Sequence, residues 1–186
     1  MMLTRKTLAL WGLALLMMVA LLLPDSEHTA GGLLPTLPGL DKNAVTRVEI
    51  TVGVRERIAM EGNVDTGWTL VQPLEAQADR ILVRSLLNLF QDPVTMDTRV
   101  DTGDRETYGL DQSNRILLEL FTGSDVPAFS LNVGADLPGG VSFVRMPDSE
   151  DIYRAKVGGR RRLDKHPKDW LDRMLVEQDL EQVASL

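Results

Sequence analysis

The stretch Trp68–Phe90 constrains the fold most, because its apolar residues change from a strand period to a helix period within one short run. Trp68 and Leu70 alternate with side chains that are smaller or more polar, which predicts a strand with one buried face. Pro73 has no backbone N–H to donate to a sheet. The strand is therefore expected to end near Gln72.

A short amphipathic helix is predicted to follow this strand. Asp79 is the expected N-cap, because its carboxylate can accept from amide groups of the first helical turn. Asp92-Pro93 is expected to end the helix, since a residue before proline avoids the helical conformation. So short a helix is not stable alone, so its apolar face must pack on another element, most simply a sheet. The residues of that face recur at helical spacing: Leu82, Val83, Leu86, Leu87 and Phe90.

Apolar alternation and turn-forming residues predict an antiparallel sheet around this helix. The expected fold class is α+β: an N-terminal transmembrane helix, then one extracytoplasmic domain of twisted antiparallel sheet with the amphipathic helix packed on it. The expected strands lie at residues 48–52, 57–61, 68–72, 94–100, 115–121, 129–133, 141–145 and 152–157.

The N-terminal apolar run Thr7–Leu23 contains no charged residue and would span about 25 Å as a helix, near the lower limit for a bilayer. Arg5 and Lys6 precede it and predict a cytoplasmic N-terminus. A cleaved signal peptide is the rival interpretation, but no small-x-small cleavage pair lies close to the run. We favour an uncleaved anchor. Its marker residues are Thr7, Leu10, Trp11, Leu16 and Leu23.

Three groups of residues are candidate partner contacts. The small residues Ala9, Gly12 and Ala14 would allow close packing of helices in a membrane. Residues 24–43 are rich in Pro and Gly and predict a tether, in which Leu33, Leu34 and Leu37 could touch the domain, the membrane or a partner. Arg160, Arg161 and Arg162 could bind phosphate or a lipid headgroup, although pairing with the protein's own Asp164 or Asp169 is the simpler expectation.

Composition limits the possible functions. The net charge is −7, which argues against nucleic acid as a partner. The chain has no cysteine and only two histidines, which excludes disulfides, thiolate zinc sites and cysteine nucleophiles. The sequence contains no catalytic motif. We therefore infer no catalytic residue, metal, cofactor or small-molecule substrate.

The order of several short motifs resembles the DUF4340 family, a family of domains of unknown function. These motifs are V-x-R-V-x-I (45–50), G-W-x-L-x-x-P (67–73), A-D-x-x-x-V-x-x-L-L-x-L (78–89), Y-G-L-D (108–111), L-x-V-G (131–134), F-V-R (143–145), I-Y (152–153) and W-L-D-R (170–173). The resemblance implies membrane-anchored bacterial envelope proteins, often encoded beside ABC-transporter components of the gliding-motility auxiliary type. It implies no catalytic residues.

The resemblance also implies a location, and the residue pattern predicts a division of the chain. The location is a bacterial inner membrane, with a single pass and the bulk of the chain in the periplasm. The division is a cytoplasmic N-terminus (1–6), an anchor (7–23), a tether (24–43), a DUF4340-like α+β domain (44–176) and an acidic tail (177–186).

The residues of these motifs are expected to have structural roles. Trp68 and Tyr108 are expected to fill the core. Gly109 and Gly134 are expected to provide positive φ or a close approach of two backbones. Arg145 is expected to pair with a carboxylate. The full set of signature residues is Trp68, Pro73, Asp79, Tyr108, Gly109, Leu110, Gly134, Arg145 and Tyr153.

Two functions follow as hypotheses. In the first, the protein is a non-enzymatic accessory subunit of an envelope or ABC-type transport assembly, and its partner is an integral membrane protein or a multi-subunit membrane complex. In the second, it is a structural subunit that docks on such a complex through its transmembrane helix and caps it with the outer domain. A metal-dependent or hydrolytic enzyme is a remote third, because the required motifs are missing.

Overall fold

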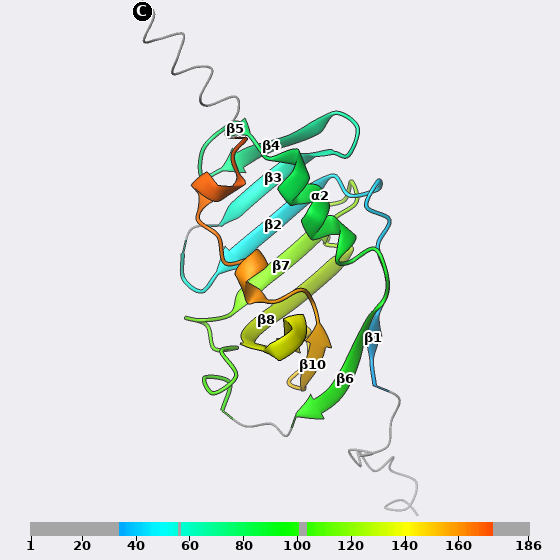
Figure 1. Cartoon of the computed structure of the whole chain (residues 1–186), viewed down its shortest axis with the longest axis vertical. Helices are drawn as coiled ribbons and strands as arrows, with labels where there is room; N and C mark the ends of the chain where they lie inside the picture. Colours follow the sequence, from blue (N-terminus) through cyan, green and yellow to red (C-terminus); the bar gives the residue numbers. More distant parts are fainter. Residues whose placement is uncertain (1–33, 56, 101–103, 173–186) are drawn as a thin grey trace, which may run out of the picture. The chain divides into compact units, whose positions relative to one another are not determined.

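The predicted amphipathic helix is present as α2, Arg80–Asn88, in the computed structural model, which describes residues 34–172 apart from residues 56 and 101–103. Asp79 caps it as predicted: its side chain accepts from the backbone N–H groups of Ile81 and Leu82. The helix ends slightly earlier than its apolar period suggested, with Leu89 at the C-cap. α2 lies over the sheet (Figure 1), and its buried residues are Val83, Leu86 and Leu87.

Within the described residues, ten strands form one sheet in the order β1-β6-β10-β9-β8-β7-β2-β3-β4-β5. All of the strand pairs are antiparallel. The strands are β1 (Thr36–Leu37), β2 (Arg47–Val52), β3 (Ile58–Asn63), β4 (Gly67–Gln72), β5 (Ala76–Gln77), β6 (Val94–Val100), β7 (Ile116–Phe121), β8 (Phe129–Leu137), β9 (Val141–Arg145) and β10 (Ile152–Lys156).

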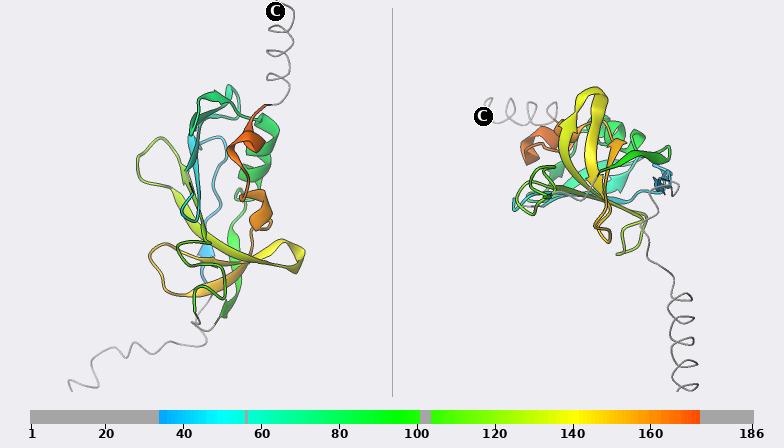
Figure 2. Two further views of the ribbon diagram at one scale, coloured as in Figure 1. Left: turned by 90° about the vertical axis from the view of Figure 1, so that its left-hand side faces the viewer. Right: turned by 90° about the horizontal axis from the view of Figure 1, so that it is seen from below.

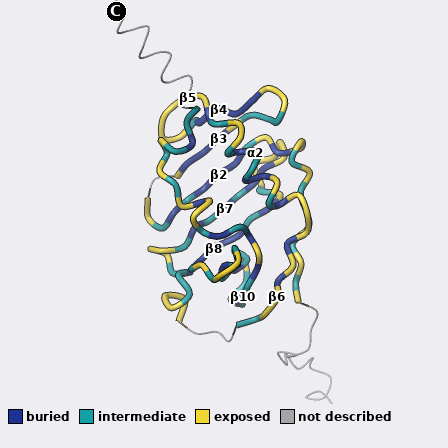
Figure 3. The backbone as a smooth tube through the Cα atoms, in the orientation of Figure 1, coloured by how far each residue is buried: buried dark blue, intermediate teal, exposed yellow. Residues whose placement is uncertain are grey.

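The sheet is strongly curved, and α2 lies against its concave side (Figure 2). Alternate residues of the central strands point toward this side, as the period of a strand requires. The buried stretches follow β2, β7 and β8 beneath the helix (Figure 3). Phe90 and Phe129 join the end of the helix to the sheet, with ring centroids 4.9 Å apart. Helix and sheet therefore share one hydrophobic core.

The fold class and the localisation are corrected by the structure. The described residues are mostly antiparallel sheet, with ten strands and one nine-residue α-helix, because short hairpins join most strands and need no crossover helices. No helix among residues 34–172, gaps excepted, is long and apolar enough to cross a bilayer. The predicted anchor Thr7–Leu23 lies outside the described residues. The single-pass inner-membrane prediction is therefore wrong for the part of the chain that the structure describes.

Part of the predicted tether belongs to the folded body. β1 pairs with β6 through Thr36↔Thr95 and Leu37↔Val94. The backbone N–H of Leu40 donates to the carbonyl oxygen of Phe90 at 2.8 Å. The side chains of Leu37 and Leu40 also pack against the protein's own hydrophobic core.

The signature residues lie in turns, in the core and at a close approach of two backbone segments. Gly109 has a φ of 64°, and Gly134 lies so close to Tyr108 that a Cβ atom would be 2.2 Å from its carbonyl oxygen. Trp68 is buried, β4 ends before Pro73 as predicted, and the Gln72–Pro73 peptide is cis. The remaining signature side chains on this part of the fold are buried or half-buried: Tyr108, Leu110 and Tyr153.

Among the described residues, the hydrogen bonds recorded for Arg145 go to backbone carbonyls and not to the expected carboxylate. Nη1 of Arg145 donates to the backbone carbonyl oxygens of Ser149 at 2.7 Å and Pro147 at 3.4 Å. These groups belong to the turn between β9 and β10. Burial, with the nearby charge of Arg105, lowers the pKa of Arg145 from its ordinary value. Arg145 thus closes a turn by satisfying backbone carbonyls, which a strand pattern cannot reveal.

Candidate functional site

The basic segment, residues 160–168, lies alongside α2 on the concave side of the sheet (Figure 1). It includes the short helix η2 (Arg160–Arg162) and leads into η3 (Pro167–Trp170). Its sequence RRRLDKHPK contains five lysines and arginines and one aspartate. In a chain of net charge −7, this is a local concentration of positive charge.

Hydrogen bonds at both ends hold the basic segment in place. At its start, the backbone N–H of Arg160 donates to Oδ1 of Asp136 at 2.5 Å, and Ser142 donates to the same oxygen at 2.8 Å. After its end, the N–H of Asp79 donates to the carbonyl oxygen of Trp170 at 2.7 Å. An isolated bridge between Ala78 and Leu171 adds a second contact there.

Asp164 joins the middle of the segment to the rest of the fold. Its carboxylate pairs with Arg55, which precedes β3, and with Nε of Arg160 at 3.2 Å. Burial alone would raise the pKa of Asp164, but the hydrogen bond and charge of Arg55, together with Arg160, hold that pKa below its ordinary value. The predicted pairing of the arginine run with Asp164 is thus observed for Arg160.

The basic hollow is a pocket of about 250 Å³ between α2 and the basic segment. Trp170 and the helix provide an apolar lining, and Ser85 lies on the helix side. Nη1 of Arg162 donates to Oγ of Ser85 at 3.3 Å, which ties the two sides together. The lining residues are Leu82, Ser85, Leu86, Arg161, Arg162, Lys165 and Trp170.

The cations of this hollow have no acidic partner among the described residues. None of the ion pairs that the structure records there involves Arg161, Arg162 or Lys165. Their positive charge is therefore not neutralised locally within that part of the chain. Such a site attracts an anionic group that also has an apolar portion.

The neighbouring hollow has a volume of about 240 Å³ and shares the lining residue Lys165 with the basic hollow. Its apolar lining comes from Val52 of β2 and Ile58 of β3. Arg55, Lys165, His166 and Pro167 complete it. Both hollows therefore combine an apolar lining with basic side chains.

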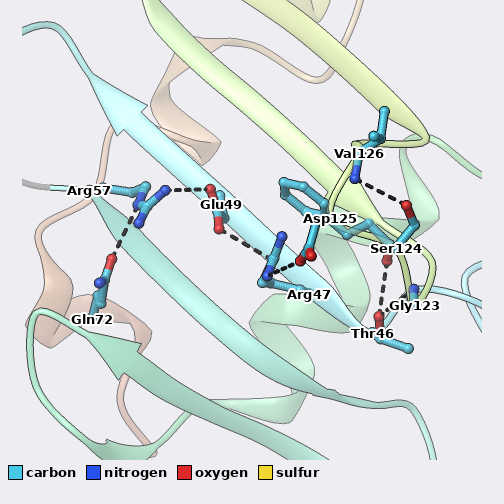
Figure 4. A network of polar contacts seen from close by, with 10 residues as sticks. Thr46, Arg47, Glu49, Arg57, Gln72, Gly123, Ser124, Asp125 and Val126 are labelled. Atoms are coloured by element: carbon cyan, nitrogen blue, oxygen red, sulfur yellow. Dashed lines mark hydrogen bonds and ion pairs between the residues drawn. The ribbon is translucent and has the colours of Figure 1, made fainter.

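A second polar cluster lies on the opposite face of the sheet (Figure 4). Glu49 accepts from Nη1 of Arg57 at 2.9 Å and pairs with Nε of Arg47 at 3.3 Å. Arg47 also lies 4.0 Å from the ring centroid of Phe121. The charges of Glu49 are thus matched within the cluster, as in a structural network.

The negative charge of Glu119 is less well compensated by nearby cations than that of Glu49. Glu119 lies directly opposite Glu49 in the β2–β7 pair. Burial, and then the charge of Glu49, raise the pKa of Glu119, while Arg57 and Arg47 oppose the change. This arrangement affects stability with pH and offers no anion-binding surface.

Few of the sequence-predicted contact residues meet at the basic hollow. Arg161 and Arg162 line it, whereas Arg160 faces Asp164 and Asp136. Leu34 and Leu37 lie elsewhere, near β1 and β6. Ala9, Gly12, Ala14 and Leu33 lie outside the described residues. The sequence reasoning did not identify Lys165, Ser85 or Trp170 as site residues, because only the chain's return to α2 brings them together.

Comparison with known proteins places the sequence in a family. No curated protein matches it, and no solved structure matches it. Among residues 34–172, apart from the gaps, no group of three or more His, Asp or Glu side chains is arranged to hold a metal ion. The model of the domain of unknown function DUF4340 matches residues 68–186, which includes α2 and the whole basic segment. The chain therefore belongs to the DUF4340 family.

Proposed function

We propose that this protein is a non-enzymatic accessory subunit that acts by binding another protein within a larger assembly. An ABC-type transport complex is the assembly that the family resemblance implies. The observation that carries the proposal is the basic hollow: Arg161, Arg162 and Lys165 without acidic partners among the described residues, around an apolar lining, in an acidic protein.

The site suits macromolecular contact better than turnover of a small molecule. Pockets for small ligands typically enclose about 300–1,000 Å³ and bury most of the ligand. The two hollows are smaller, about 250 and 240 Å³. A hollow of this size accepts a side chain, and neighbouring positive charge orients a partner of opposite sign.

Site-specific photocrosslinking in cells that make the protein tests the proposal. A photoreactive residue replaces Ile81 or Val54, whose side chains are each 78% exposed. Ile81 precedes Leu82 of the basic hollow, and Val54 precedes Arg55 of the neighbouring hollow. Val126, 72% exposed in the turn between β7 and β8, is the matched control.

The expected result is one defined protein partner, identified by mass spectrometry, from Ile81 or Val54 and not from Val126. Reversing the charges of Arg161 and Lys165 should remove that crosslink. Crosslinking to no protein from any of the three positions would overturn the proposal, as would turnover of a small molecule by the purified chain alone.

A further inference from the structure

We propose that the basic hollow and the neighbouring hollow together bind an acidic peptide segment of the partner protein. An apolar side chain of that segment enters the basic hollow between α2 and the basic segment, and its carboxylates lie over Arg161 and Lys165. This inference rests on the proposed function and adds to it the chemistry of the partner.

The apolar lining of the basic hollow favours a peptide that carries an apolar side chain. Leu82 and Leu86 line one side of the basic hollow, and Trp170 lines it as well. The indole N–H of Trp170 is buried and has no acceptor among the described residues. A phosphate or other small inorganic anion would leave this apolar surface uncovered, so charge alone does not account for the hollow.

The charges call for carboxylates on the same segment. Arg161 and Arg162 are exposed and Lys165 is half-buried. Arginine and lysine clusters recognise acidic motifs through charge-assisted hydrogen bonds. Because Asp136, Ser85 and Asp164 already hold the backbone and neighbouring side chains of this segment, little order has to be created on binding.

The arrangement of the two hollows calls for a linear segment. Both have Lys165 in their lining, and each has its own apolar lining, from α2 in one case and from β2 and β3 in the other. Successive side chains of one peptide can occupy adjacent hollows, as in other grooves that read peptides. Ile81 and Val54 are exposed apolar side chains next in sequence to residues that line the two hollows.

A membrane surface is the less suitable partner for this site. Anionic lipid attracts clusters of basic residues but repels an acidic protein as a whole. The chain carries 27 acidic against 20 basic residues. Steering by the local positive field works at short range, because salt screens charges beyond about 10 Å. A peptide that enters the hollows meets that local field.

Selection of binding peptides from a random peptide display library on the full chain tests the inference. We expect the selected peptides to combine one or more large apolar residues with at least two nearby Asp or Glu residues. Synthetic versions should bind about tenfold more weakly to Arg161→Glu/Lys165→Glu, since each of the two exposed ion pairs contributes up to about fivefold. Ser85→Phe, which fills the hollow and leaves its charges, should weaken binding similarly.

Three controls test whether the loss of binding is caused by the charges of the basic hollow. Arg84→Glu/Lys156→Glu carries the same change of charge at exposed positions outside both hollows and should bind within about twofold of the unchanged chain. Circular dichroism and unfolding curves confirm that each variant is folded. A peptide with lysine in place of each acidic residue should recover binding to the charge-reversed chain.

Several results would overturn the inference. One is selected peptides without acidic residues, or peptides that bind the charge-reversed chain equally well. Another is binding only to a chain that ends at Asp172, which would show that residues 173–186 occupy the hollows. A third is co-sedimentation with phosphatidylglycerol vesicles that depends on Arg161 and Lys165 while no peptide is selected. If photocrosslinking finds a partner only at Val126, the accessory function stands and this inference fails.

Discussion

The backbone N–H of Asp79 donates a 2.7 Å hydrogen bond to the carbonyl oxygen of Trp170, residues that are far apart in the sequence. Asp79 is also the N-cap of α2, and Trp170 lines the basic hollow. The same residue thus starts the helix and fixes the end of η3 beside it. This contact explains why the two sides of the hollow keep a defined separation.

The N-cap should contribute measurably to stability. Asp79→Ala removes the acceptor of the Ile81 and Leu82 N–H groups and leaves the bond from its own backbone to Trp170. We expect a loss of about 1 kcal/mol in the free energy of unfolding, measured with urea. Glu75→Ala, at an exposed position before the helix, should change it by less than about 0.5 kcal/mol. Equal losses in the two variants would contradict the capping role.

Asp136 should keep the basic segment closed. Asp136→Ala removes the acceptor for the N–H of Arg160 and for Oγ of Ser142. A hydrogen bond to a charged group contributes about 1.5 kcal/mol, so local opening should become about tenfold more frequent. Trypsin cleavage after Arg160, Arg161 or Arg162, followed by mass spectrometry, should accelerate by that factor. Asp148→Ala, in an exposed turn, should leave the rate unchanged.

Gly134 should not tolerate a side chain. A Cβ atom there would lie 2.2 Å from the carbonyl oxygen of Tyr108, a backbone atom that cannot move alone. Gly134→Ala should lower the free energy of unfolding by about 2 kcal/mol or more. Gly123→Ala is the comparison, because its φ of 83° is strained for alanine but nothing lies within 4 Å. Its cost should be about 1 kcal/mol. A smaller effect at Gly134 than at Gly123 would show that β8 and the turn at Tyr108 separate easily.

Glu119 should make the folded state less stable as pH rises. Burial and the charge of Glu49 raise its pKa above the ordinary value of 4.5, so the folded state binds the proton more tightly than the unfolded state. Stability from this group is therefore complete below pH 4.5 and is lost as pH rises through the raised pKa. Urea unfolding between pH 4 and 8 should show this loss in the unchanged chain relative to Glu119→Gln. Parallel pH curves for the two proteins would contradict the assignment.

The sequence predicted much of the sheet because a strand's period is local. Strands around Val48, Trp68 and Leu118 appear where alternation placed them, and so does the helix after Asp79. Two features depend on residues that are distant in the sequence. Thr36 and Leu37 lie in the predicted tether but pair with β6, and Arg145 donates to a backbone carbonyl of the turn between β9 and β10.

The candidate site was less predictable than the fold. The run of three arginines was visible in the sequence, and its simplest interpretation was pairing with the protein's own carboxylates. The structure separates the three: Arg160 pairs with Asp164, and Arg161 and Arg162 line the basic hollow. No local pattern distinguishes these fates, because they depend on which side of η2 faces α2.

By itself, the sequence determined the period of each strand, the capped helix at Asp79, the acidic balance and the family. These depend on neighbouring residues or on composition. Only the tertiary structure decided the strand order, the bond between Asp79 and Trp170, and the meeting of Lys165 with α2. The physical reason is that a hollow forms between surfaces far apart in the chain, and its shape exists only when packing brings them together.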